Sequence, residues 1–249
     1  MTAEPQLHTD LTGKVAIVTG AGRGIGRAIA RGYAAAGAHV TVAARTTVEI
    51  DAVADEIARA GGSAVAVVTD VADRDAVDAL VARTVATFGR LDLVVANAGT
   101  VRAEPPGSVV DDFAHVLDVN VTSIYVLARA AEPHLRERGG KFLVMGSGAG
   151  RRPFPSGPAY SVSKAAVAML TRCLAVEWRD VPIAVNEIVP GPVRTSMAAS
   201  ILDAPGLPTD VRLDWFKQPE DVVPMALFLA GLPDDGPSGQ TFSLLGRDG

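Results

Sequence analysis

Short apolar runs alternate along this chain with longer segments in which apolar residues recur every third or fourth position. The run at residues 14–19, KVAIVT, is rich in β-branched side chains and stops at a glycine. Such a run is typical of a parallel strand that is buried on both faces. Comparable runs predict strands at residues 39–44, 63–70, 91–99, 140–147, 182–189 and 239–245. The helical segments between them predict a parallel sheet with helices on both faces.

Composition is consistent with one large globular unit. Hydrophobic residues make up 48% of the 249 positions and charged residues 20%, which is enough apolar material for a core. Residues 1–12 are expected to form a loose leader and residues 13–249 a single α/β domain. The polar N-terminus resembles neither a signal nor a transit peptide, and no apolar run reaches membrane-spanning length. We therefore expect a cytoplasmic protein without membrane contact.

Charge, cysteine and histidine usage narrow the possible functions. The net charge is −5 and the longest run of basic residues is Arg151-Arg152, which argues against nucleic-acid binding. The single cysteine, Cys173, excludes an internal disulfide and, in its apolar helical surroundings, is predicted to be a small core residue. The four histidines are scattered without metal-ligand spacing, so no metal site is expected.

A glycine-rich turn follows the first predicted strand. The sequence GAGRGIG occupies residues 20–26 and leads directly into a helical pattern. Glycines at this point allow close approach of a pyrophosphate, and the helix N-terminus offers unpaired N–H groups. A tight turn for packing alone is the alternative, but the strand and helix on either side favour dinucleotide binding.

The end of the second strand bears on the choice of cofactor. An NAD-type site usually presents a carboxylate to the adenosine ribose there, whereas this chain has Ala44 and Arg45 and no acid before Glu49. An arginine can bind a 2′-phosphate through a bidentate fork, and Arg23 in the glycine turn could add a second positive charge. These residues favour NADP(H) over NAD(H), unless both arginines are simply solvated surface charges.

Candidate catalytic groups gather after the fifth strand. Ser147 ends that strand, and Tyr160 and Lys164 follow at a spacing of four, which places them on one face of a helix. A nearby ammonium favours phenolate and would lower the pKa of the tyrosine toward neutrality, where a general acid–base is most useful. A tyrosine and a lysine on a half-exposed helix would be the ordinary alternative.

Asn120 lies inside the long helical pattern from Val109 to about Arg138. Asparagine is a mediocre helix former, and a buried amide must be hydrogen-bonded. Asn120 is therefore either a polar residue bonded to neighbouring backbone or a site residue that perturbs the helix.

Residues 192–217 are expected to be irregular, with Pro205 and Pro208 and several bulky apolar side chains. Such a segment beside an α/β site is a candidate substrate lid, although a packed surface loop would look similar.

Together these motifs resemble the short-chain dehydrogenase/reductase family over nearly the whole chain. The family pattern is matched by Thr19-Gly20-Ala21-Gly22-Arg23-Gly24-Ile25-Gly26, by Asp70, by Asn97-Ala98-Gly99, by Asn120, Ser147, Tyr160 and Lys164, and by Asn186, Pro190-Gly191 and Thr195. Each motif alone is weak, but their order and spacing are highly specific.

The resemblance implies a Rossmann-like, doubly wound α/β fold with a mostly seven-stranded parallel sheet. It implies that Tyr160 exchanges a proton with the carbonyl or alcohol oxygen, that Lys164 lowers the tyrosine pKa and bonds the nicotinamide ribose, that Ser147 orients the carbonyl, and that Asn120 holds a water linked to Lys164. It implies cofactor contacts from Gly20, Arg23, Gly24, Ile25, Gly26, Arg45, Asp70, Val71, Asn97, Ala98, Gly99, Tyr160, Lys164, Pro190, Gly191, Val193 and Thr195.

The resemblance also implies self-association, as a homotetramer or homodimer, through the helices that carry Asn120 and Tyr160. A small-molecule ketone or secondary alcohol is the expected substrate. A 3-oxoacyl-[acyl-carrier-protein] reductase is the alternative, although two positions that are often arginine in that subfamily are Glu132 and Val176 here. A nucleotide-sensing scaffold without activity is least expected, because such proteins tend to lose the tyrosine or the lysine.

Overall fold

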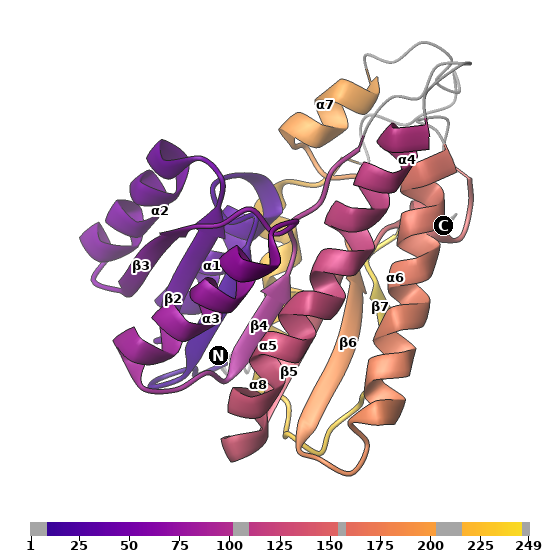
Figure 1. Cartoon of the computed structure of the whole chain (residues 1–249). Coiled ribbons are helices and arrows are strands. Elements are labelled where there is room, and N and C mark those ends of the chain that lie inside the picture. The colour runs from indigo at the N-terminus through magenta and orange to yellow at the C-terminus, as the bar shows by residue number, and fades with distance from the viewer. Residues whose placement is uncertain (1–8, 102–109, 154–157, 203–215, 246–249) are drawn as a thin grey trace, which may run out of the picture.

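The computed structural model describes residues 9–101, 110–153, 158–202 and 216–245 (Figure 1). Its strands are β1 (Val15–Thr19), β2 (His39–Ala44), β3 (Ser63–Val68), β4 (Leu93–Ala96), β5 (Gly140–Met145), β6 (Ile183–Val189) and β7 (Thr241–Ser243). Its α-helices are α1 (Gly24–Ala35), α2 (Thr47–Arg59), α3 (Arg74–Phe88), α4 (Val110–Leu117), α5 (Ser123–Arg138), α6 (Pro158–Glu177), α7 (Ser196–Leu202) and α8 (Val223–Gly231).

All seven strands form one parallel sheet in the order β3-β2-β1-β4-β5-β6-β7. The chain winds outward from β1 in one direction and then from β4 in the other, so a switch point lies between β1 and β4. In such sheets ligands bind at the carboxyl ends of the strands beside this point. The predicted doubly wound α/β fold is therefore confirmed.

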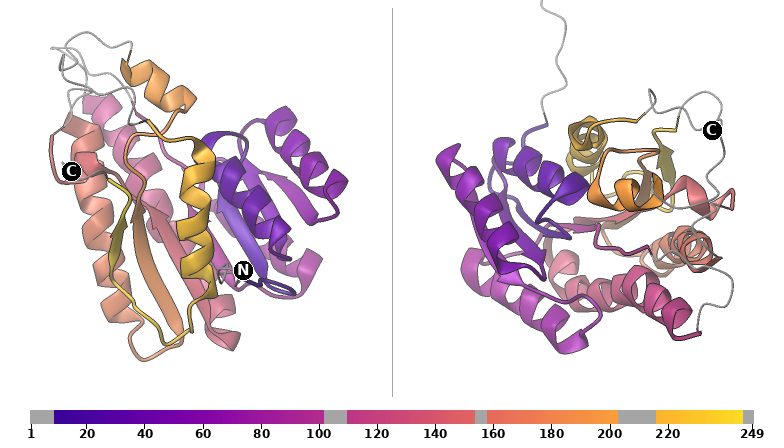
Figure 2. Two further views of the ribbon diagram at one scale, coloured as in Figure 1. Left: turned by 180° about the vertical axis from the view of Figure 1, so that it is seen from behind. Right: turned by 90° about the horizontal axis from the view of Figure 1, so that it is seen from above.

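Helices cover both faces of the sheet, as the three views show (Figures 1 and 2). Residues of α1, α2 and α8 form a buried cluster with one face, and residues of α3, α5 and α6 form a second cluster with the other. β1 is buried at all five positions, which explains its unbroken apolar sequence. Leu11, within the segment expected to be a leader, is 1% exposed and packs in the first cluster.

Local signals define several helix ends. The Asp73 side chain accepts hydrogen bonds from the N–H groups of Asp75 and Ala76 and so caps the start of α3. Gly89, with a φ of 78°, ends the same helix in the left-handed conformation. A 3-10 turn at Pro219–Val222 leads into α8, with Pro224 in its first turn, where the missing N–H is tolerated.

Two expectations are corrected by the structure. The segment predicted to be irregular at residues 192–217 contains the helix α7, while its residues 203–215, with Pro205 and Pro208, lie outside the described part of the chain. Cys173, predicted to be a core residue, is exposed. Cys173 lies on the exposed face of α6, together with Met169 and Val176.

α6 is also the one described helix long and apolar enough to cross a membrane, with 20 residues and a mean hydropathy of 1.2 in its most apolar window. The core helix of a water-soluble protein passes the same test. α6 packs against β6 and buries Lys164, Val167, Thr171 and Leu174, so we assign it to the core of this fold.

Candidate active site

The switch point is held together by hydrogen bonds between the ends of β1 and β4. The Thr19 hydroxyl accepts the N–H groups of Asn97 and Ala98, each at 3.1 Å. The Asn97 amide in turn donates to the carbonyl oxygens of Thr19, at 2.9 Å, and Gly20, at 3.3 Å. These bonds fix the Asn97-Ala98-Gly99 turn beside the glycine turn, so the two predicted cofactor segments lie together.

The glycine turn has no room for side chains at its tightest point. A Cβ placed on Gly26 would lie 2.4 Å from the Gly20 carbonyl oxygen and 2.5 Å from the Asn97 amide nitrogen. Gly24 opens α1, and a Cβ there would lie 3.1 Å from the methyl group of Thr195. The turn thus combines close backbone packing with a helix N-terminus, a cradle that suits a pyrophosphate.

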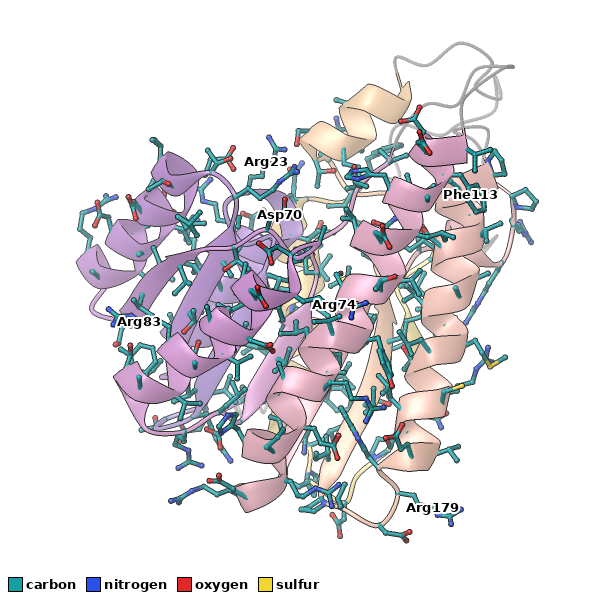
Figure 3. All side chains as sticks on the ribbon, in the orientation of Figure 1. Arg23, Asp70, Arg74, Arg83, Phe113 and Arg179 are labelled. Atoms are coloured by element: carbon teal, nitrogen blue, oxygen red, sulfur yellow. The ribbon has the colours of Figure 1, made fainter. Side chains whose placement is uncertain are left out.

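Charged residues surround this cradle. Arg45 follows β2 and is exposed, and Asp70 follows β3 and accepts the N–H of Ala72 at 3.0 Å. Arg23 and Asp70 both lie at the carboxyl edge of the sheet (Figure 3). Arg23 forms an ion pair of 3.6 Å with Glu49, whose carboxylate also covers Gly22. The sequence placed Glu49 beyond Arg45 and outside the cofactor site, but the fold brings its carboxylate against the glycine turn.

Ser147, Tyr160 and Lys164 converge at the carboxyl end of β5. Ser147 follows this strand, and its hydroxyl shares a hydrogen bond with the Tyr160 phenol. The Lys164 ammonium lies 5.8 Å from the centre of the Tyr160 ring and donates a 2.8 Å hydrogen bond to the Met145 carbonyl oxygen. The serine, tyrosine and lysine predicted from sequence are thus assembled.

Asn120 is connected through Ser163 to α6, the helix that carries Tyr160 and Lys164. The helical pattern of residues 109–138 is broken by a π-helical segment, Asp118–Thr122, between α4 and α5. Asn120 lies in it fully buried, accepts the Thr100 N–H at 2.7 Å and donates to the Thr100 carbonyl oxygen and to the Ser163 hydroxyl. Asn120 therefore shows features of both predicted alternatives. Its amide bonds neighbouring backbone, and it lies at the point where the helix is perturbed.

The pKa directions differ from the sequence expectation. Burial raises the pKa of Tyr160, and the hydrogen bond with Ser147 acts only partly against it. Burial also lowers the pKa of Lys164 to about 8, while the negative charge of Glu187 opposes this decrease. The expected lowering of the tyrosine pKa is thus not found, because burial outweighs the effects that favour the phenolate. The Lys164 ammonium donates its hydrogen bond to the Met145 carbonyl oxygen.

The segment that follows β6 lies on the other side of the candidate site from the glycine turn. Pro190 and Val193 are buried, and Gly191 has a φ of 74°. The Thr195 hydroxyl accepts the N–H of Ala198 at the start of α7. A cavity of about 470 Å³ lies between this segment and the glycine turn, with Arg23, Gly24, Thr195 and Phe216 in its wall.

Ile25, in the first turn of α1, and Val71, after β3, are half-buried against the first and the second core cluster respectively. Every predicted site residue therefore lies along the carboxyl edge of the sheet. Phe154 and residues 203–215 of the candidate lid lie outside the described residues. No metal-ligand cluster of His, Cys, Asp or Glu occurs in the part of the chain that the structure describes.

Three polar residues of the site were missed from sequence. Ser163 and Thr100 bond Asn120, which only the fold could show. Glu187 is 2% exposed beneath Gly146. Its signal was available, because an acid within the apolar run PIAVNEIV is unusual.

The arrangement of a pyrophosphate cradle beside a serine–tyrosine–lysine group defines a nicotinamide-dependent oxidoreductase. The sequence model of the short chain dehydrogenase family matches residues 14–206. The chain therefore belongs to the short-chain dehydrogenase/reductase family, enzymes that act on CH–OH and C=O groups.

Among its relatives is versicolorin reductase stcU of Emericella nidulans, 42% identical over 193 residues that span 77% of this chain and 73% of that protein. Another is a 3-oxoacyl-[acyl-carrier-protein] reductase of Synechocystis, 36% identical over 242 residues that span 96% of this chain and 98% of that protein.

Solved structures agree with this assignment. A protein from Beutenbergia cavernae, provisionally assigned as an NAD(P)-dependent gluconate 5-dehydrogenase and containing NADP at low occupancy, is 37% identical with a TM-score of 0.82 over 95% of this chain and 96% of its own. A 7α-hydroxysteroid dehydrogenase in complex with NADH is 32% identical with a TM-score of 0.89 over 96% of both chains.

Proposed function

We propose that this protein transfers hydride between NADP(H) and a small-molecule ketone or secondary alcohol, with Tyr160 as the general acid–base. The observation that carries this proposal is the convergence of Ser147, Tyr160 and Lys164 at the carboxyl end of β5. A substrate oxygen near the shared Ser147–Tyr160 hydrogen bond would meet two hydroxyl donors. Such donors stabilise the charge that develops on the oxygen of a carbonyl as it is reduced.

Each group then has a distinct role. A bound nicotinamide supplies the hydride to the carbonyl carbon in reduction or receives it in oxidation. Tyr160 donates its phenolic proton to the substrate oxygen, while Ser147 holds that oxygen by a hydrogen bond. The Lys164 ammonium stabilises the phenolate that remains and would bond the nicotinamide ribose. Asn120 would hold a water that returns the proton from solvent by way of Lys164.

The preference for NADP(H) rests on the charges around the cradle. Arg45 is exposed at the end of β2, and Arg23 lies in the glycine turn. Guanidinium groups can bind a 2′-phosphate in bidentate fashion, whereas a carboxylate at the end of β2 would repel it. One similar solved structure contains NADP and another contains NADH, so the relatives do not indicate which cofactor is preferred. The proposed preference for NADP(H) rests on Arg23 and Arg45.

Residues 192–217 would act as the substrate lid, and the protein would work in the cytoplasm as a homotetramer or homodimer. The apolar face of α6 supports self-association, since Val162, Met169 and Val176 are 46%, 54% and 65% exposed on it. Large apolar side chains gathered on one face often mark an interface.

Reduction of a 3-oxoacyl group on an acyl carrier protein is the second candidate, and the Synechocystis relative supports it. Carrier proteins are acidic, so docking would need free basic residues near α5 and α6. Arg129 is instead paired with Glu177 and Glu132, and Arg136 with Glu132. These ion pairs reduce the positive charge available for docking, which favours the small-molecule substrate.

The decisive variant is Tyr160→Phe, assayed for NADPH oxidation with a panel of ketones. Turnover should fall by at least about 100-fold, since general acid–base catalysis contributes about that much or more. NADPH binding, measured by calorimetry, should stay near that of the wild type. Tyr125→Phe removes an exposed phenol on α5 and serves as the matched control. Persistent turnover in Tyr160→Phe would overturn the assignment.

A further inference from the structure

Glu187 is a buried acid that the proposed mechanism does not use. It lies in β6, where all seven positions are buried, and its own exposure is 2%. Its strand neighbours Val185 and Ile183, two and four positions away, belong to the core cluster shared with α6. Because side chains alternate along a strand, Glu187 points toward the same face as they do, beneath α6.

Both carboxylate oxygens have defined surroundings. Oε2 accepts a 2.7 Å hydrogen bond from the Thr241 hydroxyl of β7. Oε1 lies against the backbone of Gly146, at 2.0 Å from the point a Cβ would occupy there. The three nearest atoms to that point all belong to Glu187. Gly146 is therefore a glycine because the carboxylate occupies its side-chain space, and Ser147 is the next residue.

The same backbone also receives Lys164. The ammonium donates to the Met145 carbonyl oxygen, in the peptide that joins Met145 to Gly146. Glu187 thus contacts Gly146 while Lys164 binds the peptide immediately before it. Among the described residues, the titratable groups that act on Lys164 are the Tyr160 phenol on its own helix and the Glu187 carboxylate from β6. The Asn120 amide oxygen and the ammonium both lie within 4 Å of the point that a Cβ on Gly99 would occupy.

We propose that Glu187 is a positioning residue of the active site, which holds Lys164 in its ammonium form and fixes the Gly146 backbone that carries Ser147. Without this charge, a fully desolvated lysine would lose its proton more readily, because burial disfavours the charged form. The catalytic part of this inference rests on the proposed function, whereas the effect on the charge of Lys164 does not.

The test is a titration of Lys164 itself. The chain has four lysines, at positions 14, 141, 164 and 217, so labelling with [ε-13C]lysine should give four resolvable NMR signals. The signal that is lost in Lys164→Met identifies Lys164. Its midpoint should lie near pH 8 in the wild type. In Glu187→Gln, which keeps the shape and removes the charge, the midpoint should fall by about one pH unit or more.

Thr241→Val is the matched control, because it removes the hydrogen bond to Oε2 and leaves the carboxylate; its midpoint should stay close to the wild-type value. An unchanged midpoint in Glu187→Gln would overturn the inference. If the glutamine is not tolerated in the fold, Glu187→Leu removes the charge with an apolar side chain of similar size, and the same shift is expected.

Activity provides an independent second measurement. The decline of kcat at alkaline pH should begin at lower pH in Glu187→Gln, with KM little changed. If no ketone or alcohol is turned over even by the wild type, the proposed function fails, while the NMR titration still decides the role of Glu187. A shifted NMR midpoint with an unshifted kcat profile would overturn the catalytic part alone.

Discussion

Arg23, Arg45 and Glu49 lie near the expected position of the 2′-phosphate of NADPH. Their charges would set how much more tightly this site binds NADPH than NADH. Glu49 pairs with Arg23 and covers Gly22, so its carboxylate stands beside the expected 2′-phosphate position. The variant Glu49→Gln should tighten NADPH binding by up to about fivefold, since a partly exposed charge pair is worth about 1 kcal/mol at most. NADH affinity should change little. Calorimetric titrations with both cofactors measure this difference.

Arg45→Ala should have the opposite effect and weaken NADPH more than NADH. Glu137→Gln removes an exposed acid at the far end of α5 and is the charge-matched control for Glu49→Gln. If wild-type protein binds NADH more tightly than NADPH, Arg45 is solvated surface charge and the cofactor preference is reversed.

The buried Lys164 ammonium should lower the free energy of unfolding of the protein, although the proposed mechanism requires it. Burial lowers its pKa from 10.5 to about 8. Below pH 8 the ammonium is charged in both the folded and the unfolded chain, so the whole cost of burying it is present. Between pH 8 and 10.5 the folded chain loses the proton first, and this cost disappears. The cost is roughly 3 kcal/mol, because one pKa unit is worth about 1.4 kcal/mol.

Lys164→Met should therefore be more stable than the wild type at pH 7, by about 2 kcal/mol once the lost bond to Met145 is allowed for. The advantage should shrink as the pH rises to 10. Urea unfolding at several pH values gives both free energies. All other titrating groups are common to the two proteins, so a difference independent of pH would contradict the buried-charge explanation.

At the scale of elements, one amide connects three segments. Asn120 joins the π-helical segment to Thr100 after β4 and to Ser163 on α6. Asn120→Ala would leave buried partners unsatisfied at an expected cost of about 2–4 kcal/mol, since each lost partner costs about 1–3 kcal/mol. Ser163→Ala removes a single partner and should cost about 1 kcal/mol. Denaturant unfolding compares the two, and equal losses would show that the bonds to Thr100 contribute nothing.

The strands were predictable because each is buried on both faces, so its apolar run is a local signal. The convergence of the candidate residues was predictable in part, because Ser147 follows a strand end and Tyr160 and Lys164 lie one turn apart on the next helix. Features that depend on contacts between distant segments could not be predicted from the sequence. The short helix α7, the exposed Cys173 and the pKa of Tyr160 depend on what packs against them. Glu187 gave a local signal as an acid in an apolar strand, but its place beneath Gly146 required the register of β5 with β6.

At the scale of the whole molecule, α6 presents an apolar stripe that the described part of the chain leaves uncovered. Val162, Met169, Cys173 and Val176 recur at helical spacing and are all exposed. Replacing Met169 and Val176 with aspartate should disrupt the proposed tetramer or dimer. We expect the dissociation constant to rise at least about 100-fold, because each buried apolar side chain contributes about 1.5–3 kcal/mol.

Light scattering at micromolar concentration measures this change against a monomer mass of 25.7 kDa. Val48→Asp, on the outer surface of α2, replaces a still more exposed valine and should leave the mass unchanged. If Val48→Asp also dissociates the assembly, the added charge acts without regard to position and the α6 stripe is not the interface. If wild-type protein is itself a monomer, the stripe is solvent-exposed and the active site is complete within one chain. If only the α6 variant dissociates, the α6 stripe is the interface, and Cys173, which lies on it, is covered in the assembled protein.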